Sequence, residues 1–195
     1  MINYTEYNIK AEQSNFTPVE PFLPGLGKSF EFRVVFHHSC YFSWADWDFD
    51  KDWKDVNKLI MRTLAYTPNN HLSYGAGFMP ANIENEILVT AYTNYPGTDF
   101  QTARDKSLSI PTYESLQGAT PFVGRVIRKR KSVQYYFEHG KRKLEMVEHK
   151  FKMPRFLPWV GRWTGTYMGG ANNAPGEYGG KASQNMKLWL WYKTI

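Results

Sequence analysis

The chain has 195 residues, 17% of them aromatic, and a formal net charge of +6 from 24 Lys and Arg against 18 Asp and Glu. This richness in large apolar side chains excludes an intrinsically disordered protein, and the single cysteine excludes a disulfide scaffold. No stretch approaches the ~18 uninterrupted apolar residues of a membrane span, and the first residues lack the basic and apolar regions of a signal peptide.

The first 28 residues differ in composition from the rest of the chain. Pro18, Pro21 and Pro24 disfavour both a helix and a central strand. We therefore expect an extended N-terminal arm over residues 1–28, followed by one domain over residues 29–195. The arm is expected to lie on the domain or on a neighbouring molecule, which leaves open a homo- or hetero-oligomer formed through it.

Residues 29–195 are dominated by patterns typical of β-strands. Apolar and polar residues alternate over residues 29–36, which predicts a half-buried strand. Residues 56–61 fit a short helix or a strand, and residues 100–120 and 169–180 look like loops. About nine or ten strands separated by Gly and Pro turns predict an all-β, antiparallel two-sheet sandwich. The further expected strands are residues 71–78, 86–93, 122–129, 132–138, 143–151, 162–168 and 185–193.

Three features of the sequence bear on whether the protein has a metal site or a catalytic nucleophile. Residues 46–52 contain alternating aspartates, but the glycine and terminal glutamate of a calcium loop are missing, so a polar loop is expected. The five histidines show no metal-ligand spacing, and we expect no metal and no cofactor. Cys40 lies two residues from His38, which suggests either a thiolate–imidazole pair or a small buried apolar residue.

The strand expected near the C-terminus carries the clearest candidate site. Its alternation places Met186, Leu188, Leu190 and Tyr192 on a core-facing side. The opposite face pairs two tryptophans with two lysines, which suits stacking on sugar rings and attraction of acidic groups. The alternative is that both faces are covered and the tryptophans belong to the core or to an interface. With two aromatic residues from the strand expected at 162–168, the candidate binding set is Trp163, Tyr167, Lys187, Trp189, Trp191 and Lys193.

Several segments resemble the jelly-roll sandwich of the concanavalin A-like lectin/glucanase type. They are residues 30–42, 57–92 and 165–192, and together they span most of residues 29–193. The Gly-Gly-x-Asn-x-Ala-Pro loop that ends at Pro175 resembles small jelly-roll proteins of gut Bacteroidetes and their phages. The acidic motif of the glucanases in this class, Glu-x-Asp-x-x-Glu on one strand, is absent from the chain. Its absence counts against glycoside hydrolysis.

Two functions from different classes remain open. The first is a non-enzymatic jelly-roll module that binds a glycan, or joins other subunits in a larger assembly such as a phage virion. The second is a polysaccharide lyase, in which a Tyr or His moves a proton beside a uronate carboxylate that an Arg neutralises. A basic protein with many tyrosines suits an acidic polymer, and the candidates for these roles would be His71, Tyr74, Tyr92, Arg162 and Tyr167.

The basic clusters at residues 125–131 and 141–143 are interpreted as solvated hairpin flanks, because no nucleic-acid-binding motif accompanies them. We therefore do not expect nucleic acid as a partner. Without a signal peptide the chain is expected to be made in the cytoplasm, with incorporation into a virion left open.

Overall fold

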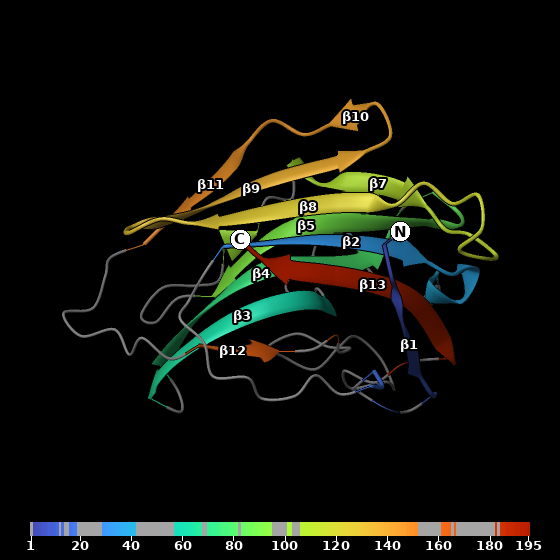
Figure 1. Ribbon diagram of the computed structural model, residues 1–195, viewed down its shortest axis with the longest axis horizontal. Coiled ribbons are helices and arrows are strands. Elements are labelled where there is room, and N and C mark those ends of the chain that lie inside the picture. The colour runs from blue at the N-terminus through green and yellow to red at the C-terminus, as the bar shows by residue number, and fades with distance from the viewer. Residues whose placement is uncertain are drawn as a thin grey trace.

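Two antiparallel β-sheets packed face to face make up the computed structural model of the chain (Figure 1). The structure describes residues 2–11, 13, 16–18, 29–41, 57–67, 70–81, 83–94, 101–102, 106–151, 161–164, 166, 182 and 184–195. Within these ranges, the side chains of residues 63–67, 70–71, 101–102 and 161–164 are not described.

Sheet A contains both ends of the described chain. Its strands have the order β1–β13–β2–β8–β9–β10, and β11 pairs with the remaining length of β9. The strands are β1 (Thr5–Ile9), β2 (Phe30–Phe36), β8 (Phe122–Arg128), β9 (Ser132–His139), β10 (Arg142–Lys143), β11 (Val147–Lys150) and β13 (Met186–Thr194).

Sheet B has the order β12–β3–β4–β5–β6, and β7 pairs with β5. The strands are β3 (Asn57–Thr67), β4 (Asn70–Pro80), β5 (Glu86–Asn94), β6 (Gln101–Thr102), β7 (Leu108–Pro111) and β12 (Gly161–Thr164). The chain crosses between the sheets after β2, β7, β11 and β12, and every strand pair in the described part of the chain is antiparallel. These crossings confirm the all-β, two-sheet jelly-roll sandwich predicted from the sequence.

The described part of the chain contains one short helix, the 3-10 turn η1 (His38–Cys40) that follows β2. Among the described residues, no helix has the length and apolar character needed to cross a membrane.

Strand β2 lies in the middle of sheet A and supplies much of one wall of the core. Its alternate residues Phe30, Phe32, Val34 and Phe36 are 0% exposed, as the period-two pattern predicts. The ring of Phe36 packs against Phe78 of β4, with 5.3 Å between the ring centroids. This contact joins sheet A to sheet B through apolar surface, which is the main stabilising force of a sandwich.

A glycine makes room for one of these rings. Gly124 of β8 lies directly across from Phe32 of β2, and a Cβ at Gly124 would lie 2.2 Å from the Phe32 ring. The Phe32 ring therefore lies over Gly124. It packs against the rings of Phe122 and Phe137, at centroid distances of 5.9 and 6.3 Å. A side chain at position 124 would have to displace this aromatic cluster.

A buried polar group of residues links the two sheets beside the apolar core. The Tyr135 hydroxyl on β9 donates a hydrogen bond of 2.8 Å to the Tyr92 carbonyl on β5 and contacts the Thr93 hydroxyl. Nδ1 of His149, on β11, lies 2.9 Å from Thr93 Oγ1. His149 is only 6% exposed, and burial lowers its pKa to about 4. It is therefore held neutral inside the sandwich at neutral pH.

Several boundaries differ from the sequence-based expectations. Residues 57–67 form the long strand β3, which resolves the choice between helix and strand. The loop expected over residues 100–120 is wrong in part, because β6 and β7 lie within it and Leu108 and Ile110 of β7 are buried. The strand expected over residues 143–151 is divided into β10 and β11, and one extra residue lies between the two pairings with β9.

The described part of the N-terminal segment completes sheet A. β1 pairs with β13 along its whole length, and Tyr7 and Ile9 enter the core at 3% and 2% exposure. Phe16 is equally buried at 2%. Apolar residues from the segment thus contribute to the core of the sandwich, and the domain boundary after residue 28 stays a prediction.

The core-facing residues of β13 give a direct test of this fold. Leu188 and Leu190 are 0% and 3% exposed, so truncation to Ala should leave a cavity and lower the free energy of unfolding by about 2–5 kcal/mol. The exposed Lys193→Ala variant should stay within about 0.5 kcal/mol of the wild type. Denaturant unfolding of the three variants measures both effects, and a loss below about 1 kcal/mol for both leucines would contradict the placement of β13.

The buried histidine predicts a specific acid sensitivity. Because the pKa of His149 is lowered in the folded state, the unfolded chain takes up a proton first as the pH falls below about 6.5. The stability contributed by neutral His149 is present above that pH and is lost as the pH falls towards 4. Between about pH 7 and pH 4 the loss should reach about 3 kcal/mol.

The His149→Gln variant keeps a polar side chain but has no proton to gain, so it is the matched control. Urea unfolding of both proteins across this pH range measures the difference between them. Parallel pH curves would show that His149 is not buried in its neutral form.

Candidate functional site

The outward side of β13 carries alternating tryptophans and lysines. β13 lies between β1 and β2, so Trp189 has Glu6 on one side and Val35 on the other, while Trp191 lies opposite Arg33. Directly opposed residues of an antiparallel pair share a face, so these side chains gather on the outer surface of sheet A. We call Lys187, Trp189, Trp191 and Lys193 of β13, together with Arg33 of β2, the aromatic–basic strip.

Trp189 is the fixed member of the strip. It is 8% exposed, and its indole N–H donates a 3.1 Å hydrogen bond to Glu6 Oε2. The Lys187 ammonium lies 5.0 Å from its ring centroid, and the His37 ring meets it edge-on at 6.0 Å. These contacts fix the orientation of the indole and cover most of it, so little of the ring is open to a ligand.

Trp191 is the more accessible of the two tryptophans. Its side chain is half-buried, with Arg33 5.8 Å and Lys193 5.6 Å from the ring centroid. Glu31 holds Arg33 at 3.8 Å and Arg125 at 3.4 Å, which keeps both guanidinium groups near the sheet surface. An aromatic ring between cations is a suitable surface for a ring-shaped polar ligand with a negative charge.

A cleft of about 640 Å³ opens beside Trp189, between the ends of β1 and β13 and the turn η1. Lys187 belongs both to this cleft and to the strip, so the two form one continuous surface. Amides, hydroxyls and cations make up most of the lining. The lining residues are Asn8, Ile9, Lys10, Gln13, Thr17, His37, Ser39, Asn185, Met186 and Lys187.

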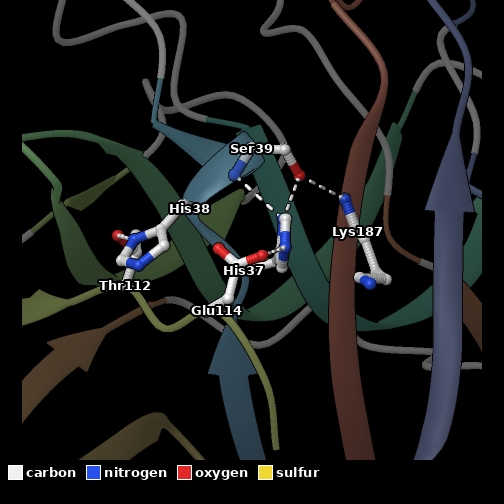
Figure 2. Close-up of polar contacts among 6 residues, drawn as sticks. All are labelled: His37, His38, Ser39, Thr112, Glu114 and Lys187. Atoms are coloured by element: carbon white, nitrogen blue, oxygen red, sulfur yellow. Dashed lines mark hydrogen bonds and ion pairs between the residues drawn. The ribbon is translucent and has the colours of Figure 1, made fainter.

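Figure 2 shows how η1 is fastened to β13 at the edge of the cleft. The Ser39 backbone N–H donates to His37 Nδ1 at 3.1 Å, so Nδ1 is an acceptor and the ring proton is on Nε2. The Ser39 hydroxyl then donates to the same nitrogen at 2.8 Å and accepts the Lys187 backbone N–H at 3.1 Å. His37 Nε2 faces Glu114 Oε1 at 3.9 Å.

This arrangement caps η1 and positions Lys187. Glu114, which would have to orient His37 in a catalytic triad, is 82% exposed, and it therefore gives His37 little electrostatic support. The neighbouring His38 is engaged elsewhere, with Nδ1 2.7 Å from Thr112 Oγ1 (Figure 2).

Two titratable groups at the site have shifted pKa values. A hydrogen bond from Asn8 and a second from Trp189, together with the Lys187 charge, hold the pKa of Glu6 below its usual value against the opposing effect of burial. Burial lowers the pKa of His37, Lys187 lowers it further, and Glu114 opposes the change. Glu6 is thus anionic and His37 mostly neutral at pH 7.

The structure brings together four of the six predicted binding residues, namely those of β13. Trp163 lies on β12 in sheet B, where it pairs with Arg62 of β3. It therefore belongs to a different sheet from β13. Tyr167 lies outside the described residues.

The residues suggested for a lyase are divided by the structure. Tyr74 of β4 points into the core and is 0% exposed, and burial raises its pKa to about 12. Tyr92 of β5 lies opposite Gly75, the next position along β4, so it points to the other face of sheet B. Tyr74 and Tyr92 therefore do not point to the same face of sheet B. His71 and Arg162 lie on β4 and β12, which flank β3, and Tyr167 lies outside the described residues.

Cys40 is a buried apolar residue and not half of a thiolate–imidazole pair. It is 0% exposed, and burial raises its pKa to about 12. Its thiol donates to the Lys187 carbonyl at 2.9 Å, while His38 contacts Thr112. In the described part of the chain, no three His, Cys, Asp or Glu side chains gather to hold a metal ion. The alternating aspartates of residues 46–52 lie outside the described ranges.

Sequence reasoning missed the partners that β1, β2 and η1 bring to the site. Glu6, Arg33 and His37 are far from β13 in the sequence, and only the order β1–β13–β2 places them beside it. Arg33 is recognisable in advance as a polar-face residue of its strand, but its neighbour across the sheet is not. The cleft amides Asn8 and Asn185 carry no local signal.

Comparison with known proteins gives structural similarity without a family. No protein-family model and no curated protein matches the sequence. Among solved structures, the catalytic domain of an endo-1,3-beta-glucanase (laminarinase) from Thermotoga petrophila RKU-1 aligns with 97% of this chain and 75% of its own, at 9% identity and a TM-score of 0.47. An endo-beta-1,4-glucuronan lyase from the fungus Trichoderma reesei aligns with 98% of this chain and 81% of its own, at 9% identity and a TM-score of 0.44.

A legume lectin-like domain from Entamoeba histolytica covers 99% of this chain and 90% of its own, at 10% identity and a TM-score of 0.38. These structures include the glucanase and lectin types that the sequence resembles. At identities of 9–10%, none of them carries a function over to this chain. The resemblance to proteins of gut Bacteroidetes and their phages stays a prediction.

Proposed function

We propose that the protein is a non-enzymatic carbohydrate-binding module whose ligand lies along the aromatic–basic strip and reaches into the cleft beside it. The single observation that supports this most strongly is the position of Lys187, which lines the cleft and also lies over the Trp189 ring. The cation that lines the cleft together with hydrogen-bonding amides therefore lies on the same strand as Trp191, which provides the accessible aromatic ring.

The chemistry of this surface suits a sugar ring. The apolar face of a pyranose packs against an aromatic ring, and half-buried Trp191 provides one on the outer surface of sheet A. The hydroxyls of a sugar need both donors and acceptors, which the amides of Asn8, Gln13 and Asn185 supply in the cleft. Fixed strands on a sandwich also keep these groups in place before the ligand arrives.

Two other functions receive less support. A lyase would need a base that reaches the ligand, whereas Tyr74 is buried in the core and its raised pKa opposes ionisation. A role as a subunit of a larger assembly, such as a phage virion, is proposed from the sequence alone. In that case the same strip would contact another protein, because tryptophan and arginine are frequent in protein interfaces.

Trp191 gives the test of glycan binding. The Trp191→Ala variant should weaken binding to any glycan that the wild type selects on a glycan array by about tenfold or more, because it removes the stacking ring. Since Trp191 is half-buried, its free energy of unfolding should fall by less than that of Leu190→Ala. Isothermal titration and denaturant unfolding measure the two effects.

The matched control is Tyr136→Ala. Tyr136 is another aromatic residue of sheet A, 41% exposed on β9, and it lies opposite Arg125 on the far side of β2. This variant should bind as the wild type does. The proposal fails if the wild type selects no glycan, or if Trp191→Ala binds unchanged.

A further inference from the structure

We infer that the cleft between β1, β13 and η1 binds an anionic group attached to a sugar ring, so that the ligand is an acidic glycan carrying carboxylates or sulfate esters. This inference rests on the proposed carbohydrate binding and adds the chemical class of the ligand.

The charged side chains among the described lining residues of the cleft have one sign. Lys10 and Lys187 line it, His37 can add a third positive charge, and none of the described lining residues is acidic. The nearest carboxylates are engaged or turned to solvent. Glu6 accepts from Asn8 Nδ2 at 3.0 Å and from the Trp189 indole at 3.1 Å, while Glu114 is 82% exposed. An anion that enters the cleft therefore meets the lysines directly, while the carboxylates of Glu6 and Glu114 lie outside the described lining.

Lys187 is positioned by its backbone before any ligand binds. Its N–H donates to Ser39 Oγ at 3.1 Å, and its carbonyl accepts from the Cys40 thiol at 2.9 Å and from the His37 N–H at 3.2 Å. The strand is thus fixed on the side that faces η1, and the ammonium lies at the edge of the cleft above Trp189. Little backbone ordering remains to be done when an anion arrives.

The amides show which of their groups face a ligand. Asn185 accepts the Ala11 N–H through Oδ1 at 3.0 Å, so its NH₂ group is the half that can donate to an oxyanion or a sugar oxygen. Asn8 gives an NH₂ hydrogen to Glu6, so its amide oxygen can accept a sugar hydroxyl. A donor and an acceptor beside two lysines suit a charged sugar better than a simple inorganic ion, which has no hydroxyl to donate.

His37 should make the affinity depend on pH. The groups that face it are Lys187 on β13, Glu114 after β7, its neighbour His38, and Glu6 on β1. Burial and Lys187 lower the pKa of His37, and a bound anion would raise it. The added proton enters at Nδ1, where the Ser39 hydroxyl can turn from donating to accepting. Affinity for an anion should therefore rise as the pH falls, because the complex takes up a proton that the free protein does not hold.

The test uses matched pairs of probes that differ only in charge. Oligogalacturonate is compared with its methyl ester, and dextran sulfate with dextran, by isothermal titration at low ionic strength. The wild type should bind the charged member of at least one pair about tenfold more tightly, and the pair that responds identifies carboxylate or sulfate as the group. Lys187→Gln and Lys10→Gln should each remove much of that preference.

Lys141→Gln is the charge-matched control, because Lys141 is an exposed residue of the β9–β10 turn and loses the same single charge. A melting curve of each variant shows whether it is folded. If Lys187→Gln does not fold, Lys10→Gln still provides the test.

The pH dependence is measured with dextran sulfate, whose esters stay ionised. Wild-type affinity should rise about threefold or more from about pH 7.5 to about pH 5.5, and His37→Gln should abolish the rise.

The outcomes separate the two proposals. Equal binding of both members of each pair would overturn the inference and leave carbohydrate binding intact. Failure to bind any glycan, charged or neutral, would overturn both. An equal loss of affinity in Lys141→Gln, or tighter binding of a single-stranded oligonucleotide of equal charge than of either polyanionic glycan, would show a diffuse basic surface and contradict a built site.

Discussion

Strand β13 pairs with β1 on one side and with β2 on the other. This pairing determines which of its side chains face the core and which face outward. The pairing with β1 covers Thr5–Ile9 and the pairing with β2 covers Phe30–Phe36, so the register of β13 is set from both sides. A shift of one residue would move Leu188 and Leu190 out of the core and turn the tryptophans inward. The core, the aromatic–basic strip and the cleft all depend on this one register.

The two faces of β13 are connected through its neighbours. On the inner side, β2 contributes phenylalanines that pack across to sheet B, and β1 adds Tyr7 and Ile9. On the outer side, Glu6 of β1 binds the Trp189 indole, and Arg33 of β2 lies over Trp191. The same pairing that buries apolar surface thus orders the polar groups of the site. The packed sandwich therefore also holds the site in place. The buried contacts among Tyr135, Thr93 and His149 link the two sheets and support this packing.

Much of the fold follows from local patterns in the sequence. Alternation in residues 29–36 and 185–193 predicts both strands and the correct core-facing residues, because burial of one face requires period two. Local patterns predict a strand less well where its formation depends on pairing with strands far away in the sequence. β1 is short and precedes a proline-rich stretch, β7 ends on Pro111, and the break between β10 and β11 depends on their common partner β9. The site is only half predictable, because Trp189 and Trp191 are visible in one strand whereas Glu6, Arg33 and His37 reach them through long-range pairing.

The most direct test of the account follows the indole N–H signals by nuclear magnetic resonance while an acidic oligosaccharide is added. Trp189→Phe and Trp191→Phe assign the two signals among the seven tryptophans of the chain. The account predicts that the Trp191 signal shifts with saturation and that the Trp189 signal, which reports its hydrogen bond to Glu6, shifts with the same binding constant. Saturable shifts confined to other tryptophans, with both of these signals unchanged, would contradict a binding site on the outer face of β13.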